Sequence, residues 1–239
     1  MARQQHFRFD VAGMRSTTLF ITGTDTGVGK TVLATLLARY FRERGVKVAA
    51  LKPICSGGRG DARVLRAALN GALTLDEINP WHFRAPIAPV LAARRERKRA
   101  KLSQVLAHVL AVQKRFDVLL VEGAGGLLSP LGEDFDSRDL IASLRATPVV
   151  VCPNRLGAVN QVLLTLDALP RSAAATARVV LMSPPKPDAS TRTNADLLAE
   201  YFDGKRIFLL PWLGRRIDWT HRLRNLQVQR TLQALASAG

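Results

Sequence analysis

Nine residues near the start of the chain have the types and spacing of a loop that binds phosphate groups. They read Gly-Thr-Asp-Thr-Gly-Val-Gly-Lys-Thr, from Gly23 to Thr31. Glycines let backbone N–H groups turn toward an anion, and a helix that begins directly after them adds unpaired N–H groups and the positive end of its dipole. In such a loop Lys30 reaches the outer phosphates of a nucleoside triphosphate, and the Thr31 hydroxyl binds Mg²⁺.

This loop is one residue longer than the commonest phosphate loop. The common pattern needs a glycine five positions before Gly29, where this chain has Thr24, and the glycine lies at Gly23 instead. A turn used only for tight packing would not explain why lysine and threonine follow. The residues expected to bind nucleotide in this segment are Gly27, Val28, Gly29, Lys30, Thr31 and Val32.

Two acidic residues follow segments that have the composition of strands. Glu122 ends an apolar run and precedes a glycine-rich segment, and Asp61 follows another strand by way of Ser56-Gly57-Gly58-Arg59-Gly60. Mg²⁺ prefers oxygen ligands and is usually held by one or two carboxylates together with substrate phosphates. We therefore predict a metal site formed by Thr31, Asp61 and Glu122. For Asp61, a role as the N-cap of the following helix is the alternative; for Glu122, the alternative is an ordinary polar strand end.

Lys52 stands at the end of the second expected strand, directly before Pro53. A lysine fixed at that place could stabilise the negative charge that develops during group transfer. The alternative is an ordinary surface lysine.

The elements that must position these residues alternate along the chain. Six short apolar segments have the composition of buried strands: 18–22, 46–51, 118–121, 149–152, 178–182 and 207–210. Segments with helical spacing or composition are 30–44, 62–69, 102–114, 139–144, 159–169, 194–201 and 222–236, and Ser183–Ser190 is expected to be a loop.

This alternation predicts an α/β fold with one doubly wound domain over residues 17–239. Its sheet should be mainly parallel with helices on both faces, as in phosphate-loop NTPases. Ligands of such folds bind beyond the carboxyl ends of the strands, which is where Lys52 and Glu122 stand.

The composition restricts the class of protein. The 239 residues are 47% hydrophobic, enough for a sizeable core, yet no apolar run approaches the roughly 20 residues of a membrane span, so we expect no membrane partner. Residues 1–16 are interrupted by charges and are predicted to be a flexible leader rather than a secretory signal. The two cysteines, Cys55 and Cys152, are far apart, which favours a reducing cytoplasm over a disulfide framework or zinc site.

The net charge of +16 attracts phosphorylated ligands without indicating a specific nucleic-acid site. The densest basic run spans 94–101 and is interpreted as a solvated face or loop, with a docking surface for an acidic partner as the alternative. No aromatic residues interleave with it, as stacking on single strands would require.

Several short segments, taken in order, resemble dethiobiotin synthetases. They are Gly23–Thr31, Lys52-Pro53-Ile54-Cys55-Ser56-Gly57, Asp61, Asn79-Pro80 with Pro86 and Pro89, Val121-Glu122-Gly123-Ala124-Gly125-Gly126, Leu156-Gly157-Ala158-Val159-Asn160 and Pro211-Trp212-Leu213. Each is weak alone, but the long phosphate loop, Lys-Pro-x-x-Ser-Gly and Val-Glu-Gly-Ala-Gly-Gly in sequence are specific.

The resemblance implies an ATP- and Mg²⁺-dependent ring closure in biotin synthesis. The diamine 7,8-diaminononanoate takes up CO₂ as a carbamate, the carbamate attacks the γ-phosphate, and the second amine closes the ureido ring while phosphate leaves. A homodimer is implied, with the substrate at its interface.

By matching position, the resemblance also implies roles for individual residues. Lys30, Lys52 and Thr24 would be catalytic, and Ser183 and Pro211 would join the nucleotide site. The substrate site would contain Ser56, Glu122, Gly125, Leu156, Gly157 and Asn160. The segment Leu156–Asn160 would receive the substrate carboxylate at a helix start, which suits an anion; an ordinary strand-to-helix loop is the alternative.

The match departs from the family at a few positions. Ser183 stands where an asparagine usually reads the nucleotide base, and a hydroxyl lacks the paired donor and acceptor of an amide. Selectivity for adenine is therefore predicted to be relaxed. Asn160-Gln161 replaces a commoner Asn-His, and Val90 replaces a polar residue.

Three other functions are considered. A cobyrinate-type synthetase would need an amidotransferase domain. A partitioning or positioning ATPase of the same fold usually has a lysine where this chain has Asp25. A basic nucleic-acid-binding module would leave Lys30, Thr31 and Glu122 unexplained, and its binding would depend steeply on salt.

Overall fold

The computed structural model describes residues 17–214 and 217–237. The expected leader, residues 1–16, lies outside the described residues, so its prediction is not tested.

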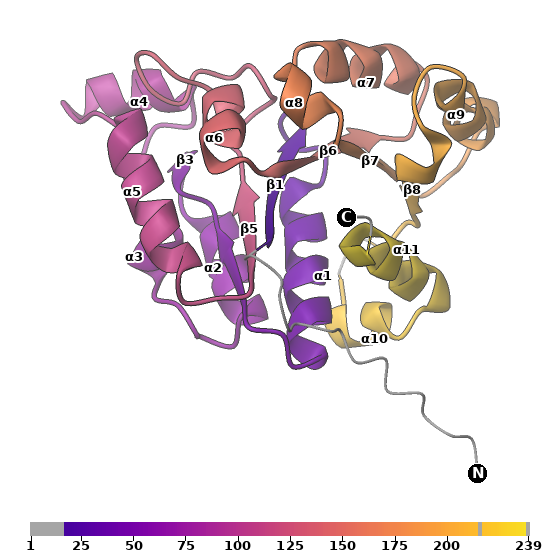
Figure 1. The fold of residues 1–239 in the computed structure, drawn as a ribbon, viewed down its shortest axis with the longest axis horizontal. Coiled ribbons are helices and arrows are strands. Elements are labelled where there is room, and N and C mark those ends of the chain that lie inside the picture. Colours follow the sequence, from indigo (N-terminus) through magenta and orange to yellow (C-terminus); the bar gives the residue numbers. More distant parts are fainter. Residues whose placement is uncertain (1–16, 215–216, 238–239) are drawn as a thin grey trace.

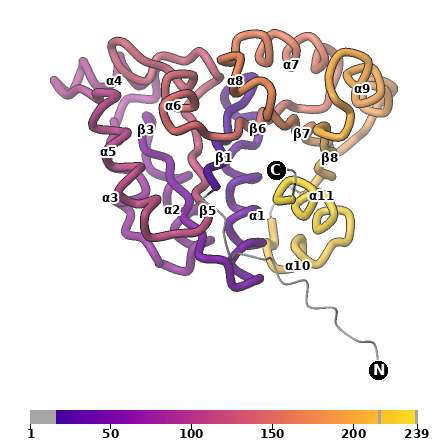
Figure 2. The backbone as a smooth tube through the Cα atoms, in the orientation of Figure 1, coloured from indigo at the N-terminus to yellow at the C-terminus, as the bar shows by residue number. Residues whose placement is uncertain are grey.

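A six-stranded parallel sheet forms the centre of the molecule, as the alternation of segments predicted (Figures 1 and 2). Its strands follow the order β2-β5-β1-β6-β7-β8. Their bounds are β1 Thr17–Gly23, β2 Val48–Leu51, β5 Val118–Glu122, β6 Thr147–Pro153, β7 Arg178–Met182 and β8 Ile207–Leu210. In the register of the central strand, Phe20 of β1 lies opposite Val121 of β5 and Pro148 of β6. All carboxyl ends therefore share one edge of the sheet.

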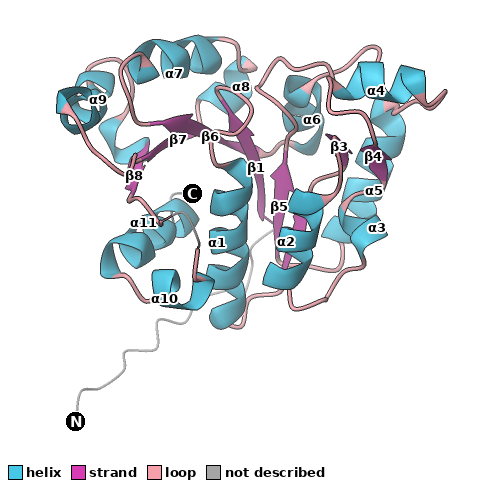
Figure 3. Cartoon of the chain, turned by 180° about the vertical axis from the view of Figure 1, so that it is seen from behind, coloured by secondary structure: helices cyan, strands magenta, loops and turns pink. Residues whose placement is uncertain are grey.

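Helices cover both faces of this sheet. One face carries α1 (Lys30–Glu43), α2 (Gly60–Ala68), α10 (Trp219–Leu223) and α11 (Leu226–Ser237). In Figure 3, α1 and α2 stand in front of the strands, and α10 and α11 lie beside α1 below β8. The other face carries α5 (Leu102–Gln113), α6 (Ser137–Leu144), α7 (Ala158–Asp167), α8 (Arg171–Ala174) and α9 (Ala189–Ala199). A short 3₁₀ turn, η1 (Gly204–Arg206), precedes β8. Most residues of these strands are buried, although Leu209 of the edge strand β8 is 39% exposed. Burial from both faces explains why the strands are mainly apolar.

A second, two-stranded parallel sheet was not predicted. It pairs β3 (Ile54–Ser56) with β4 (Trp81–Phe83) and contacts α4 (Pro89–Arg95). The short helix α3 (Leu75–Ile78), which precedes β4, packs against α2 and β2. Strands of three residues are too short to show a two-residue period, so the sequence pattern could not reveal them. The small sheet fixes the segment that follows Lys52.

Several predicted boundaries shift. The strand predicted over 46–51 begins at Val48, and the helix predicted over 194–201 begins already at Ala189, so the loop from Ser183 is shorter than expected. The earlier start follows from Asp188, whose carboxylate accepts a hydrogen bond from the Thr191 N–H at 2.9 Å as an N-cap.

The segment 222–236, predicted to have helical composition, is divided between two helices, α10 and α11, with Asn225 between them. The Asn225 side chain accepts hydrogen bonds from the N–H groups of Gln227 and Val228 at 2.9 and 3.2 Å, and thereby starts the second helix.

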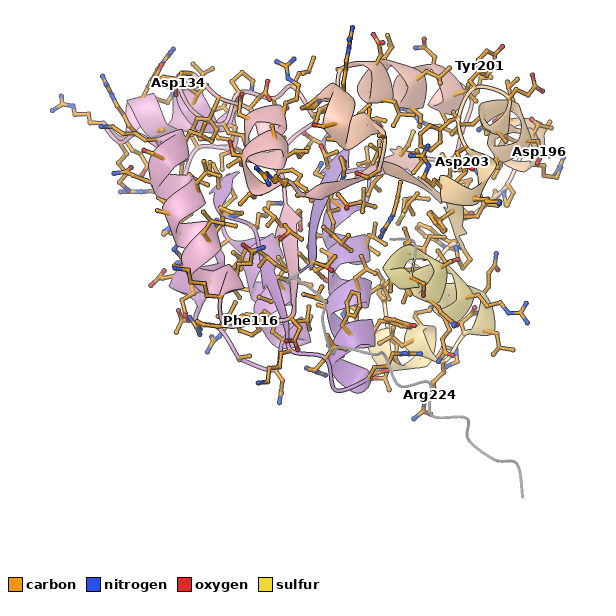
Figure 4. The ribbon with its side chains drawn as sticks, viewed as in Figure 1. Phe116, Asp134, Asp196, Tyr201, Asp203 and Arg224 are labelled. Carbon is orange, nitrogen blue, oxygen red and sulfur yellow. The ribbon has the colours of Figure 1, made fainter. Side chains whose placement is uncertain are left out.

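The basic run 94–101 begins in the last turn of α4 and continues through a tight turn. Arg97 has a left-handed backbone (φ +53°), and the N–H of Lys98 returns to the carbonyl of Ala93, which closes the helix end. Arg94 forms an ion pair with Glu133, and Lys98 forms one with Glu96. Figure 4 places Asp134, the neighbour of Glu133, at this end of the molecule, opposite Asp196, Tyr201 and Asp203 around α9. The run is largely exposed, as predicted; the docking alternative stays a prediction.

Candidate functional site

The phosphate loop lies between β1 and α1 at the carboxyl edge of the sheet. Gly27 and Gly29 have left-handed backbones, with φ of +73° and +106°, and the N–H of Thr24 is bonded to the carbonyl of Val151 in β6 at 3.0 Å. A Cβ added at Gly29 would also lie 2.8 Å from the Cε of Met182. Glycine is therefore required there by both conformation and space.

Lys30 begins α1 and is nearly buried at 5% exposure. Its Nζ donates to the backbone carbonyl of Asp25 at 2.7 Å, which bends the side chain over the loop. Burial lowers the pKa of Lys30 to about 8; Glu122 opposes this shift and the nearby Lys52 adds to it. A buried cation with a lowered pKa gains much from an anionic ligand, because the ligand replaces the lost solvation.

Glu122 ends β5 and is 2% exposed. Its Oε1 accepts hydrogen bonds from the Thr31 hydroxyl at 2.7 Å and from Lys52 Nζ at 2.8 Å. Burial raises the pKa of Glu122, and Lys52 and Thr31 oppose that rise. Its other oxygen, Oε2, is buried without a hydrogen-bond partner among the residues that the structure describes. An unpaired buried carboxylate oxygen is costly and therefore points to a ligand.

Lys52 lies between two carboxylates, those of Glu122 and Asp61. Burial by itself would lower the pKa of Lys52, but the two carboxylates outweigh it, so the pKa is raised and the ammonium form is held. Its backbone carbonyl accepts a hydrogen bond from the amide of buried Asn79 at 2.7 Å. Lys52 is therefore a buried site residue, and the alternative of a surface lysine is wrong.

The N-cap alternative for Asp61 is also wrong. Helix α2 begins at Gly60 with Arg59 in the cap position, so Asp61 lies inside the first turn, and no side chain caps the helix. The carboxylate binds Lys52 instead, with about half of its side chain exposed.

A cavity of about 630 Å³ opens beside this ionic cluster. The sequence-predicted residues Lys52, Ser56, Asp61 and Gly125 all line it, although they come from four separate segments. The Ser56 hydroxyl donates to the carbonyl of Ile87 at 2.5 Å, which ties the small sheet to the segment before α4. The structure thus places these four predicted residues on the wall of one cavity.

A smaller cavity of about 310 Å³ lies on the other side of the phosphate loop, at the ends of β6, β7 and β8. Gly27, Val28, Gly29 and Val32 line it together with Ser183 and Pro211. Six of the eight residues predicted to bind nucleotide therefore line one space, although Ser183 and Pro211 are far from the loop in sequence. The other two, Lys30 and Thr31, do not line it.

Leu156, Gly157 and Asn160 line neither cavity. Gly157 is the N-cap of α7 with φ +90°, and Leu156 before it is 83% exposed. A third cavity of about 510 Å³ separates this region from the phosphate loop, and Thr24 and Gln161 line it. Within one chain, the segment Leu156–Asn160, which is predicted to receive the substrate carboxylate, thus lies apart from the ionic cluster.

Sequence reasoning missed two residues of the site. Ser129 lines the first and third cavities, and its hydroxyl accepts a hydrogen bond from the N–H of Gly126 at 2.9 Å. A serine shortly after a glycine-rich strand end could have been noticed as a candidate. Asn154 lines the smaller cavity and is 1% exposed; its position just after β6 is the signal that could have identified it.

The oxygen groups near the phosphate loop suit Mg²⁺. Among the described residues no group of three or more His, Cys, Asp or Glu side chains could hold a metal ion by itself. Mg²⁺ does not require one, because it keeps waters and binds substrate phosphates alongside one or two carboxylates. The Thr31 hydroxyl, the Asp61 carboxylate and the unpartnered Oε2 of Glu122 provide such a donor set.

A parallel α/β sheet whose first strand leads through a glycine-rich loop to Lys30-Thr31 defines a phosphate-loop NTPase. The protein family described as "AAA domain" matches residues 17–220. Among solved structures, the chain is similar to pNOB8 ParA bound to nonspecific DNA, with a TM-score of 0.57 and 11% identity over 94% of this chain and 98% of that one. At that identity the likeness supports the fold alone.

Sequence relatives identify the family within this class. The chain is 41% identical over 199 residues to the ATP-dependent dethiobiotin synthetase BioD of Anaeromyxobacter dehalogenans (strain 2CP-C), covering 81% of this chain and 89% of the relative. It is 34% identical over 211 residues to that of Thermodesulfovibrio yellowstonii, covering 81% and 88%. It is 36% identical over 151 residues to that of Methanococcus vannielii, covering 63% and 72%. The chain belongs to the family of ATP-dependent dethiobiotin synthetases, and so to the ATP-dependent ligases.

Proposed function

We propose that this protein closes the ureido ring of dethiobiotin from 7,8-diaminononanoate and CO₂, using ATP and Mg²⁺. The observation that carries the proposal is the buried cluster of Lys30, Thr31, Lys52 and Glu122 with Asp61 at its edge. It lies between two cavities of suitable size for a nucleoside and a small diamine.

In this proposal the nucleotide lies across the phosphate loop. The triphosphate occupies the N–H groups of Gly27 to Thr31, and the base enters the smaller cavity beside Ser183 and Pro211. The γ-phosphate then points toward the larger cavity, where the diamine lies against Ser56 and Gly125. Both reactants meet at Lys30 and Lys52.

Thr31, Asp61 and Glu122 would hold the Mg²⁺ ion, which would neutralise phosphate charge when bound. The unpartnered Oε2 of Glu122 supports this assignment. Lys52 then keeps both carboxylates in place, because its ammonium already contacts each of them.

The proposed reaction needs few catalytic groups from the chain. First, an amine and CO₂ give a carbamate and a proton. A carbamate oxygen then attacks the γ-phosphorus, and ADP leaves. Finally, the second amine attacks the carbamate carbon, and phosphate and a proton leave. The attacking oxygen is already anionic, so a strong general base is not needed. Lys30 and Lys52 would stabilise the negative charge, with Thr24 beside them, and catalysis would consist of positioning and charge stabilisation.

We further propose a homodimer in which the start of α7 from one subunit serves the site of the other. Exposed leucines support an interface here: Leu156 is 83% exposed, Leu164 on α7 is 63% exposed, and Leu128 near the third cavity is 53% exposed. The N-terminal N–H groups of α7 would receive the substrate carboxylate.

We place the protein in the cytoplasm. Both cysteines are free thiols, as in reducing compartments. Among the described residues, no helix has both the length and the apolar character needed to span a membrane.

The test is product formation. The purified protein is incubated with the diamine, bicarbonate, Mg²⁺ and ATP, and dethiobiotin is measured by mass spectrometry. We expect product from the parent protein and none from the Lys30→Ala variant, because Lys30 is the cation nearest the loop carbonyl of Asp25. Absence of product with every nucleoside triphosphate would refute the substrate assignment, and full activity of the variant would refute the role of Lys30.

A further inference from the structure

The smaller cavity offers a base mainly apolar walls. The side chains of Val28, Val32 and Met182 form one part of it, and Pro184, Pro211, Leu213 and Ile217 form much of the rest. Such walls hold any flat aromatic ring by contact and by excluding water, without selecting its hydrogen-bonding edge. Discrimination between bases therefore depends on the few polar groups in the lining.

The one amide side chain among the described lining residues is already engaged in the fold. Asn154 donates from Nδ2 to the carbonyl of Thr191 at 2.9 Å, and its Oδ1 accepts from Nδ2 of Asn194 at 2.8 Å. Asn194 also donates to the carbonyl of Arg155 at 3.0 Å. With Asn154 1% exposed and Asn194 6% exposed, this pair joins β6 to α9 and leaves no free amide edge for a base.

At four backbone positions around the cavity there is no free N–H donor. Pro184 and Pro211 have no N–H, the N–H of Ser183 is bonded to the carbonyl of Leu210 at 2.9 Å, and the N–H of Asn154 is bonded to the carbonyl of Met182 at 2.8 Å. These bonds continue the sheet past the ends of its strands, so they are part of the framework.

Three described side chains with polar groups remain, Ser183, Arg155 and Trp212. A single hydroxyl can rotate to donate or accept, and so adapts to either base edge. A guanidinium can bind O6 and N7 of guanine as a pair, so Arg155 gives no advantage to adenine over guanine. The indole N–H of Trp212 can only donate, and none of the three groups offers the paired donor and acceptor of an amide.

We infer that the smaller cavity accepts the base by shape and apolar contact, so that the protein uses guanosine and pyrimidine nucleoside triphosphates as well as ATP. The inference rests on the proposed placement of the nucleotide and extends it to the class of co-substrate. Sites that discriminate by apolar contact alone separate ligands by about 10- to 200-fold, whereas sites with fixed buried hydrogen-bonding groups separate them by about 10⁴-fold or more.

The experiment is competition for a ribose-labelled fluorescent ATP analogue, with Mg²⁺ present, by unlabelled ATP, GTP, CTP and UTP. We expect all four to displace the label, with Kd values within about 200-fold of one another. A wider spread in favour of ATP would overturn the inference, and failure of all four to displace the label would overturn the placement of the nucleotide.

Two variants sharpen the result. Ser183→Asn supplies an amide with a paired donor and acceptor, and we expect it to raise the preference for ATP over GTP by about fivefold or more, as one or two new hydrogen bonds allow. Ser183→Ala is the matched control and should change that preference less than about twofold. A loss of ATP preference by tenfold in Ser183→Ala would show that the hydroxyl reads the base, against the inference.

Product formation separates this inference from the proposed function. Dethiobiotin formed with ATP alone would overturn the inference and leave the function intact. Similar displacement of the label by all four nucleotides, with no dethiobiotin from any of them, would support acceptance of all four bases by the cavity and refute the proposed reaction.

Discussion

The contact between Lys52 and Glu122 provides a quantitative test of the site, because both groups are buried and each depends on the other. Their side chains are 9% and 1% exposed, and the Nζ to Oε1 distance is 2.8 Å. Replacing Lys52 by Met keeps much of the side-chain volume but removes the cation. Glu122 is then left with one remaining donor, the Thr31 hydroxyl.

Removing one partner of a buried ion pair typically costs about 3–5 kcal/mol, because the other charge stays buried without compensation. For a chain of this size, 1 kcal/mol corresponds to about 2–4 °C in Tm, so Lys52→Met should lower Tm by roughly 6–20 °C. Glu122→Gln should cost less, about 1–3 kcal/mol, because Lys52 retains Asp61 at the more exposed edge.

The double variant, Lys52→Met with Glu122→Gln, should be more stable than the sum of the two single changes by about 0.5–3 kcal/mol, since no buried charge is then left alone. The effect should also depend on pH. Burial already raises the pKa of Glu122, and loss of Lys52 raises that pKa further. The folded state then binds the proton more tightly than the unfolded state, so the cost of Lys52→Met is largest near pH 8 and shrinks as the pH falls.

Urea denaturation of the four proteins at pH 5.5 and 8, followed by circular dichroism, measures these differences. Glu133→Gln is the control, because its pair with Arg94 is on the surface, and its denaturation midpoint should stay within error of the parent. The reasoning is refuted if Lys52→Met costs less than about 1 kcal/mol at pH 8, or if the effects of the two single changes simply add.

Three further predictions concern ligands and assembly. Glu122→Gln should raise the Mg²⁺ concentration for half-maximal activity about tenfold or more, and an unchanged metal titration would remove Glu122 from the metal site. The pKa of Lys30 in the protein without nucleotide is about 8, so its ammonium form is lost as the pH rises through that value. Nucleotide affinity should therefore fall roughly eightfold from pH 7.5 to 9. A constant Kd in fluorescence titrations would contradict this. Leu164→Asp should shift a dimer to monomer in analytical ultracentrifugation, whereas Leu226→Asp, a similarly exposed leucine at the start of α11, should not.

The sequence was sufficient to predict the parallel sheet because β1, β5, β6 and β7 are continuous apolar runs between helical segments. Parallel strands end at a common edge, so residues that follow different strands were expected to meet there. Lys52 and Glu122 confirm this expectation in the structure.

Features that depend on contacts between distant segments were not predictable in the same way. The alternatives for Lys52 and Asp61 stayed open because the sequence gives no distance between them, and only the fold brings them together. The strands β3 and β4 are stabilised by each other and not by any local pattern. The engagement of Asn154 with Asn194 likewise joins residues 40 positions apart.

The early start of α9 has a different cause. Thr and Asn residues in 189–194 weaken the apolar period that identifies a helix, while the capping bonds of Asp188 stabilise one. At this helix start, the Asp188 cap is therefore a better indicator than the apolar period.

A crystal structure of the protein with a non-hydrolysable ATP analogue, Mg²⁺ and the diamine tests the central claim most directly. We expect phosphates on the N–H groups of Gly27 to Thr31, the base in the cavity beside Ser183, and the metal ion within bonding distance of Thr31 and Glu122. Nucleotide bound elsewhere, with the loop free of phosphate, would contradict it.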